Sequence, residues 1–151
     1  QIDENYANAY YNWGIALAEL AKLKGDEKLF KESFKKFEKA TQIDKYYADA
    51  YNNWGSALLD LANLRGSIKE DSGKIKEKLI KAYDLGNKTS LYNLACLSSL
   101  LDEKDEAFEW LEKALQNEEY SREYFESDFA NLRQDPRFEE LLNKYLPKQE
   151  E

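Results

Sequence analysis

Two stretches of this chain are nearly identical. Residues 9–17 read AYYNWGIAL, residues 50–58 read AYNNWGSAL, and the two lie 41 positions apart. A weaker copy, LYNLACLS at residues 91–98, aligns Leu91 with Tyr51 and so follows a further 40 positions along. Each copy precedes a second stretch that ends in a Lys-Ala pair, at residues 39–40, 81–82 and 113–114. A two-part unit that occurs three times is typical of proteins that stack one supersecondary element repeatedly.

The repeated unit has the periodicity of paired α-helices. In its first part, apolar residues recur at i, i+3, i+4 and i+7, the spacing of one face of an amphipathic helix. Only 2 Pro and 6 Gly interrupt the chain, and Gly25 and Gly66 each follow a basic residue, which predicts two helix ends. Gly14 and Gly55 lie inside the expected helices, where each costs about 1 kcal/mol relative to Ala. We expect a close approach between helices to offset that cost in an all-α fold.

This pattern resembles the tetratricopeptide repeat (TPR) family, which alternates aromatic, small and apolar residues along a pair of helices. The first two units match it with Tyr10, Trp13, Gly14, Leu17, Ser33, Phe37 and Ala40, and with Tyr51, Trp54, Gly55, Leu58, Ile75, Leu79 and Ala82. The third unit matches it with Leu91, Leu94, Ala95, Ser98, Ala107, Leu111 and Ala114. The resemblance implies a right-handed superhelical solenoid of helix pairs that forms a single domain over residues 1–151. Its repeats would span 6–45, 47–87 and 88–118, with capping helices at 120–146 and with Tyr10 and Tyr51 in the core.

The first two units are longer than the family's unit by about two helical turns. We expect one extra turn on each helix, and a polar loop over residues 66–73 is the alternative for the second unit. After residue 120 the repeat decays. Asp135 and Pro136 predict the start of a final helix, with Asp as N-cap and Pro in the first turn. The residues expected to cover the end of the stack are Phe129, Leu132, Phe138 and Leu142.

The composition excludes several kinds of chemistry. The chain has no His and one Cys, so it has no imidazole base, no Ser-His-Asp triad and no thiolate zinc site. Its apolar runs are far shorter than a membrane span needs. A net charge of −8 disfavours nucleic acid as a partner. The free Cys96 favours a reducing, cytoplasmic compartment but leaves the location open, and a chain that begins at Gln1 is expected to be a fragment or a processed form.

The resemblance implies a concave groove lined by the first helix of each unit. The candidate peptide-binding residues, taken by helical spacing, are Tyr11, Asn12, Ile15, Glu19, Asp49, Asn52, Asn53, Ser56, Asp60, Tyr92, Asn93 and Cys96. Asn12, Asn53 and Asn93 recur at one place in the three units. A carboxamide both donates and accepts hydrogen bonds, so the three could hold a peptide backbone. The alternative is that each Asn contacts its own neighbouring helix or water.

The groove lacks the cations of family members that clamp a C-terminal carboxylate, and Glu19, Asp49 and Asp60 favour a basic or neutral peptide instead. The sequence therefore predicts a non-enzymatic protein–protein interaction scaffold without cofactor, metal or membrane insertion. Self-association into a homo-oligomer is the main alternative. An enzyme built on Glu19 and Asp60 is a weaker one, because no metal cluster, phosphate loop or activated nucleophile accompanies them. Residues 101–151 hold 7 basic and 16 acidic side chains, which form either a solvated helix face or a docking patch for a basic partner.

Overall fold

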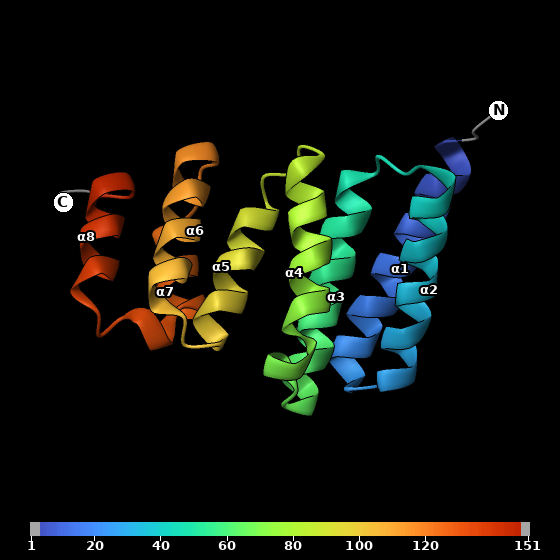
Figure 1. Cartoon of the computed structure of the whole chain (residues 1–151), viewed down its shortest axis with the longest axis horizontal. Helices are drawn as coiled ribbons and strands as arrows, with labels where there is room; N and C mark the ends of the chain where they lie inside the picture. The colour runs from blue at the N-terminus through green and yellow to red at the C-terminus, as the bar shows by residue number, and fades with distance from the viewer. Residues whose placement is uncertain (1–3, 149–151) are drawn as a thin grey trace. The chain divides into compact units, whose positions relative to one another are not determined.

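A computed structural model describes residues 4–148 of the chain, and the side chains of residues 6–148. The secondary structure of this part is entirely helical, with short connections and no strand, as expected for an all-α protein (Figure 1). The elements are α1 (Glu4–Lys24), α2 (Glu27–Ile43), α3 (Ala48–Arg65), α4 (Ile68–Asp84), α5 (Ser90–Leu100), α6 (Lys104–Asn117), α7 (Arg122–Asp128), η1 (Ala130–Leu132) and α8 (Pro136–Tyr145). Two compact units meet at the Ser90–Leu91 bond, and we call them the N-terminal unit and the C-terminal unit. The single domain and the superhelix stay predictions.

Two long hairpins make up the N-terminal unit. Helix α1 packs along α2, α3 packs along α4, and α2 also packs against α3 (Figure 1). Gly25 and Gly66 adopt φ values of 62° and 71°, the left-handed conformation that ends a helix and that glycine adopts without strain. Both predicted helix ends are therefore confirmed. The expected lengthening is also confirmed, and the polar loop at residues 66–73 is wrong, because α4 begins at Ile68.

The hairpins close tightly at two of the glycines inside helices, Gly14 and Gly55. A Cβ added at Gly14 would lie 2.8 Å from Cε1 of Phe37, and one added at Gly55 would lie 2.7 Å from Cδ2 of Leu79. No real Cβ atom tolerates such distances, so each glycine allows the facing helix to approach. The expected close approach is confirmed at both positions.

An aromatic stack repeats on the first helix of each hairpin. Tyr10 stacks on Trp13 with ring centroids 6.3 Å apart, and Tyr51 stacks on Trp54 at 6.5 Å. The expectation that the two tyrosines belong to the core is wrong, because both are only half-buried. The stack runs along the helix surface, where a lysine from the paired helix covers each indole. The Nζ atom of Lys36 lies 3.7 Å from the Trp13 ring centroid, and that of Lys78 lies 4.1 Å from the ring of Trp54.

The C-terminal unit has its own core. The four residues expected to cap the stack are all buried there, at 0–3% exposure: Phe129, Leu132, Phe138 and Leu142. Ala107, Leu111 and Phe125 belong to the same buried cluster. Asp135 accepts a hydrogen bond from the backbone N–H of Arg137 at 3.0 Å, with Pro136 in the first turn, which confirms the predicted start of α8.

Candidate functional site

A cleft of about 330 Å³ lies between α1 and α3 in the N-terminal unit. It brings together five of the residues predicted to form the groove: Ile15, Glu19, Asn53, Ser56 and Asp60. Ala18, Lys22, Phe37 and Ala57 complete the lining. Positions three and four apart share one face of a helix, which explains why the residues of each helix converge on the cleft. The cleft thus combines an apolar interior with a polar and charged rim.

One ion pair crosses the cleft. Lys22 Nζ lies 3.4 Å from Asp60 Oδ1, and the lysine side chain is the more exposed of the two. Burial raises the pKa of Asp60 above its usual value, and the nearby Lys22 ammonium opposes this shift only in part. Glu19 is exposed on the same face. Two carboxyl side chains and one amine therefore line the cleft, so its lining holds one more acidic than basic residue.

Tyrosine hydroxyls and amides link the two hairpins beside the cleft. Asn53 Nδ2 donates a hydrogen bond to the Tyr11 hydroxyl at 2.8 Å, and the Tyr11 ring lies 4.9 Å from that of Tyr47. The Tyr47 hydroxyl in turn donates to Asn8 Oδ1. Burial is the main cause that raises the pKa of Tyr11 and that of Tyr47, the latter to about 12. Both hydroxyls therefore keep their protons at neutral pH.

The other predicted residues of the N-terminal unit lie outside the cleft lining. Asn12 is exposed on α1, and Asn52 is buried at 6% exposure. Asp49 Oδ1 accepts a hydrogen bond from Asn87 Nδ2 at 2.7 Å. The alternative for the three asparagines is a contact with a neighbouring helix or with water. Asn53 makes such a contact, with Tyr11 of α1.

The last three predicted residues, Tyr92, Asn93 and Cys96, are half-buried on α5 in the C-terminal unit. The Tyr92 ring packs against Phe125 and Phe129, each with centroids 5.3 Å away, and its hydroxyl donates to Asp128. Burial raises the pKa of Tyr92, and the Asp128 carboxylate adds to the shift. Tyr92 therefore contributes to the core of its own unit, and an asparagine ladder that includes Asn93 stays a prediction.

Sequence reasoning missed four residues of the cleft. Lys22 follows Ile15 by seven positions and Glu19 by three, so the helical spacing already used for α1 could have found it. Phe37 and Ala57 gave no such signal, because their apolar side chains match ordinary core positions. The cleft depends on how α2 approaches α1 and α3, which no local pattern describes.

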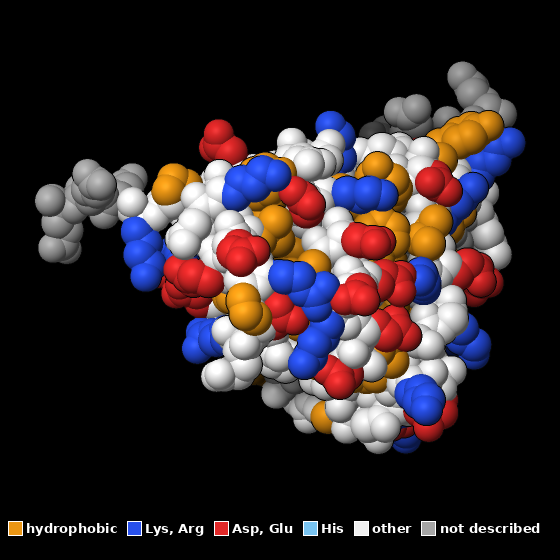
Figure 2. All heavy atoms as spheres, turned by 60° about the vertical axis from the view of Figure 1, so that its left-hand side comes forward, with side chains coloured by type: hydrophobic (Ala, Val, Ile, Leu, Met, Phe, Trp, Pro, Cys, Tyr) orange, Lys and Arg blue, Asp and Glu red, His pale blue; other side chains and the backbone are white. Residues whose placement is uncertain are grey.

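A second cleft, of about 590 Å³, lies between α6 and α8 in the C-terminal unit. Its lining is mostly charged: Asp105, Phe108, Glu109, Glu112, Arg137, Glu140, Leu141 and Lys144. Arg137 pairs with Asp105 at 2.6 Å, and Lys144 pairs with Glu112 at 3.1 Å. Figure 2 shows acidic and basic side chains interspersed on one face, with hydrophobic atoms between them. Cations of the same unit therefore neutralise part of the acidic patch that the sequence indicated.

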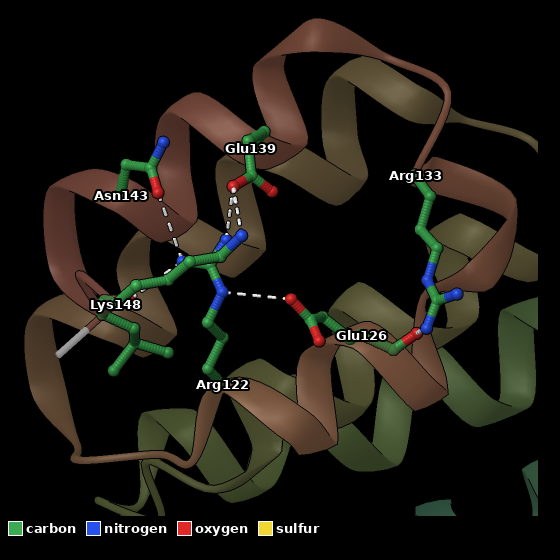
Figure 3. A network of polar contacts seen from close by, with 7 residues as sticks. Arg122, Glu126, Arg133, Glu139, Asn143 and Lys148 are labelled. Carbon is green, nitrogen blue, oxygen red and sulfur yellow. Dashed lines mark hydrogen bonds and ion pairs between the residues drawn. The ribbon is translucent and has the colours of Figure 1, made fainter. Parts of the chain in front are cut away.

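The densest polar network, around Arg122, has a structural role. Its guanidinium donates to Glu126 at 3.0 Å, to Asn143 at 3.3 Å and to the backbone oxygen of Leu146 at 3.0 Å, and it pairs with Glu139 (Figure 3). These partners tie the start of α7 to α8. The side chain is 14% exposed and its guanidinium contacts four acceptors, so the network fastens two helices rather than presenting a charge to a ligand.

No family model matches this chain, and no curated protein matches it in sequence. Over residues 4–148, the helices lack the combination of length and hydrophobicity needed to cross a bilayer. In the same part of the chain, acidic and Cys side chains do not gather in groups of three that could hold a metal ion. The geometry of the cleft between α1 and α3 is therefore the main guide to function.

Proposed function

We propose that this chain is a non-enzymatic interaction module of the TPR kind, which binds a basic or neutral peptide segment in the cleft between α1 and α3. The observation that carries the proposal is the convergence of Glu19 and Asp60 on one cleft with an apolar interior. These two carboxylates come from different hairpins and face a single ammonium, that of Lys22. A Lys or Arg side chain of a bound peptide would relieve this imbalance, while an apolar neighbour would contact Ile15 and Ala18.

The chemistry of the cleft supports recognition better than catalysis. Asp60 is already paired with Lys22, and both tyrosine hydroxyls beside the cleft are protonated donors at neutral pH. An exposed carboxylate, a paired carboxylate and a hydroxyl suit hydrogen bonding to a peptide. A reaction would also need an activated nucleophile or a bound electrophile, and the composition supplies no imidazole to activate one.

Selection from a random-peptide display library tests the proposal. The selected peptides should be rich in Lys and Arg, and their affinity should fall as the salt concentration rises. The double variant Glu19→Gln with Asp60→Asn should weaken binding by about tenfold or more, because charged hydrogen bonds are lost. Ser56→Phe should weaken it as well by filling the cleft.

The matched control is Glu32→Gln with Asp84→Asn, which removes the same two charges from exposed positions on α2 and α4. Peptides whose affinity drops equally in the control and in the cleft variant would respond only to net charge. Peptides that bind both variants as tightly as the wild-type chain would place recognition elsewhere. Either result contradicts the proposal.

Self-association is the second candidate function, and exposed apolar side chains on α1 favour it: Tyr6, Trp13, Leu20 and Leu23. Sedimentation velocity over a wide range of protein concentrations distinguishes the two candidates. A sedimentation coefficient that rises with concentration supports self-association, whereas a monomer at every concentration removes it.

A further inference from the structure

The outward face of α1 carries an apolar stripe with heptad spacing. Its six members alternate at three and four positions, and we call them the outer stripe: Tyr6, Ala9, Trp13, Ala16, Leu20 and Leu23. All six are exposed, with Tyr6 at 63%, Trp13 at 52% and Leu20 at 39%. A helix that is apolar along such a stripe normally packs it against a neighbour. The outer stripe shares no residue with the cleft between α1 and α3.

An identical stripe occurs 41 positions later, beginning at Tyr47, the residue before α3, and continuing along that helix. Its residues are Tyr47, Ala50, Trp54, Ala57, Leu61 and Leu64, which match the outer stripe at every position. The stripe on α3 does pack against a neighbouring helix. Ala57 and Leu61 share a buried cluster with Phe30 and Phe37 of α2, and Trp54 packs against that cluster.

The two copies of the stripe differ in how much of each side chain is buried. Leu61 is 4% exposed where Leu20 is 39% exposed, and Ala50 and Ala57 are buried where Ala9 and Ala16 are exposed. Only the last position is mainly exposed in both copies, at Leu23 and Leu64. Because the side chains are the same, the difference comes from the first hairpin. Its helix α2 covers Ala57 and Leu61, and its Tyr11 on α1 packs against Tyr47, whereas the outer stripe of α1 is exposed.

Helix α2, which covers the stripe on α3, has a bulky apolar face and a carboxylate in its first turn. Helix α2 presents Phe30, Phe34 and Phe37 at spacings of four and three, which is the complement of a stripe with heptad spacing. Its first turn holds Glu27, which accepts hydrogen bonds from Arg65 at 2.7 and 3.0 Å. Lys24 of α1 stands 41 positions before Arg65 of α3, so both helices carry a cation at the end of the stripe.

We propose that the outer stripe of α1 is a docking surface for an amphipathic helix of a partner protein, one with bulky apolar residues at the spacing of α2 and a carboxylate in its first turn. The partner helix would lie on α1 as α2 lies on α3. It would bury the ring of Trp13 and the side chain of Leu20, and its carboxylate would pair with Lys24. This surface acts independently of the cleft between α1 and α3.

A fluorescein-labelled peptide of residues 26–44, which carries α2 and its N-cap Asp26, is the probe. Its anisotropy is measured against the intact chain. We expect saturable binding that Ala16→Glu and Leu20→Glu each weaken by about tenfold or more, because a carboxylate would be buried in an apolar contact. Both side chains are exposed in the free chain, so circular dichroism should stay unchanged.

Two controls sharpen the measurement. Asn63→Glu adds the same charge at an exposed position of α3 and should leave the affinity of the peptide unchanged. Lys24→Glu should weaken binding, and a peptide with Glu27→Lys should restore it. Restoration by this charge swap fixes the direction of the docked helix, which a non-specific apolar contact would not do.

Three results would overturn the proposal. The peptide could fail to bind the wild-type chain in a saturable way, or it could bind with an affinity that Ala16→Glu and Leu20→Glu leave unaltered. The third is a dimer of the chain that Ala16→Glu dissociates while the peptide does not bind. In that case a second copy of the chain, rather than a partner helix, would cover the stripe.

Discussion

The two hairpins of the N-terminal unit share their internal contacts and differ in their surroundings. Each places a glycine against a bulky side chain, Gly14 against Phe37 and Gly55 against Leu79. Each also covers a tryptophan with a lysine. Yet the apolar stripe on the first helix is exposed in one hairpin and largely buried in the other. Sequence similarity therefore sets the contacts inside a hairpin, whereas the adjacent hairpin decides which surface is buried.

The largest expected effect comes from placing a charge at corresponding positions of the two stripes. Ala57→Glu should destabilise the fold by roughly 3–5 kcal/mol, because it buries an unpaired carboxylate beside Leu61. Ala16→Glu should change stability by less than about 0.5 kcal/mol, because that position is exposed. Urea denaturation of both variants measures the difference. Equal losses at the two positions would mean that α1 is covered in solution.

The two closely packed glycines, Gly14 and Gly55, should give the next largest effect. Gly14→Ala and Gly55→Ala should each cost about 1–3 kcal/mol, because the new methyl group overlaps Phe37 or Leu79 by more than the gain in helix propensity can offset. The matched control is Gly73→Ala, since a Cβ there meets no atom within 4 Å. That variant should gain about 0.5–1 kcal/mol. A gain at all three glycines in thermal or urea denaturation would contradict the close approach of the helices.

The N-cap of the second helix should give a smaller difference in stability between the two hairpins. Asp26 caps α2 by accepting hydrogen bonds from the N–H groups of Lys28 and Leu29. Ser67 precedes α4, but its hydroxyl donates to Asp71 instead of capping the backbone. Asp26→Ala should therefore cost about 1 kcal/mol, and Ser67→Ala should cost less. Urea denaturation that gives the reverse order would show that the two caps are misassigned.

The smallest expected effect is a contrast in pH dependence between two ion pairs that join the hairpins. Burial raises the pKa of Asp60, so the protonated carboxyl is favoured in the folded state. The stability that this group contributes is therefore present at low pH and is lost as the pH rises through the folded-state pKa. The hydrogen bond from Arg65 lowers the pKa of Glu27, so its contribution is present above the unfolded-state pKa and is lost as the pH falls through the folded-state pKa.

Urea denaturation at a series of pH values measures this contrast in two variants. Relative to the wild-type chain, Asp60→Asn should become more stable as the pH rises from acid to neutral, and Glu27→Gln should become less stable. Trends of the same sign in the two variants would contradict the opposite environments of the two carboxylates.

Much of the fold could be predicted because its signals are local. Gly25 and Gly66 marked helix ends, and Asp135 with Pro136 marked a helix start. The 41-residue offset indicated paired helices of unusual length. The loop expected at residues 66–73 was wrong because polarity alone does not prevent a helix, and this segment supplies the exposed first turn of α4.

The candidate site was predictable only in part. Helical spacing found Ile15 and Glu19 on α1, and the same spacing on α3 found the residues that face them. It could not show that Tyr92 would join an aromatic cluster with Phe125 and Phe129, because those residues are more than thirty positions away. Contacts of that kind depend on how helices pack, and a pattern within one helix carries no information about its neighbour's position.

The exact match between the two stripes has a consequence for building longer chains. The junction between Tyr46 and Tyr47 joins the end of one hairpin to the first residue of the α3 stripe. A duplicate of residues 6–46 placed directly before Tyr6 would recreate that junction and would offer the outer stripe a second α2. The chain could therefore be extended one hairpin at a time with no redesigned interface, so that its length becomes an adjustable property.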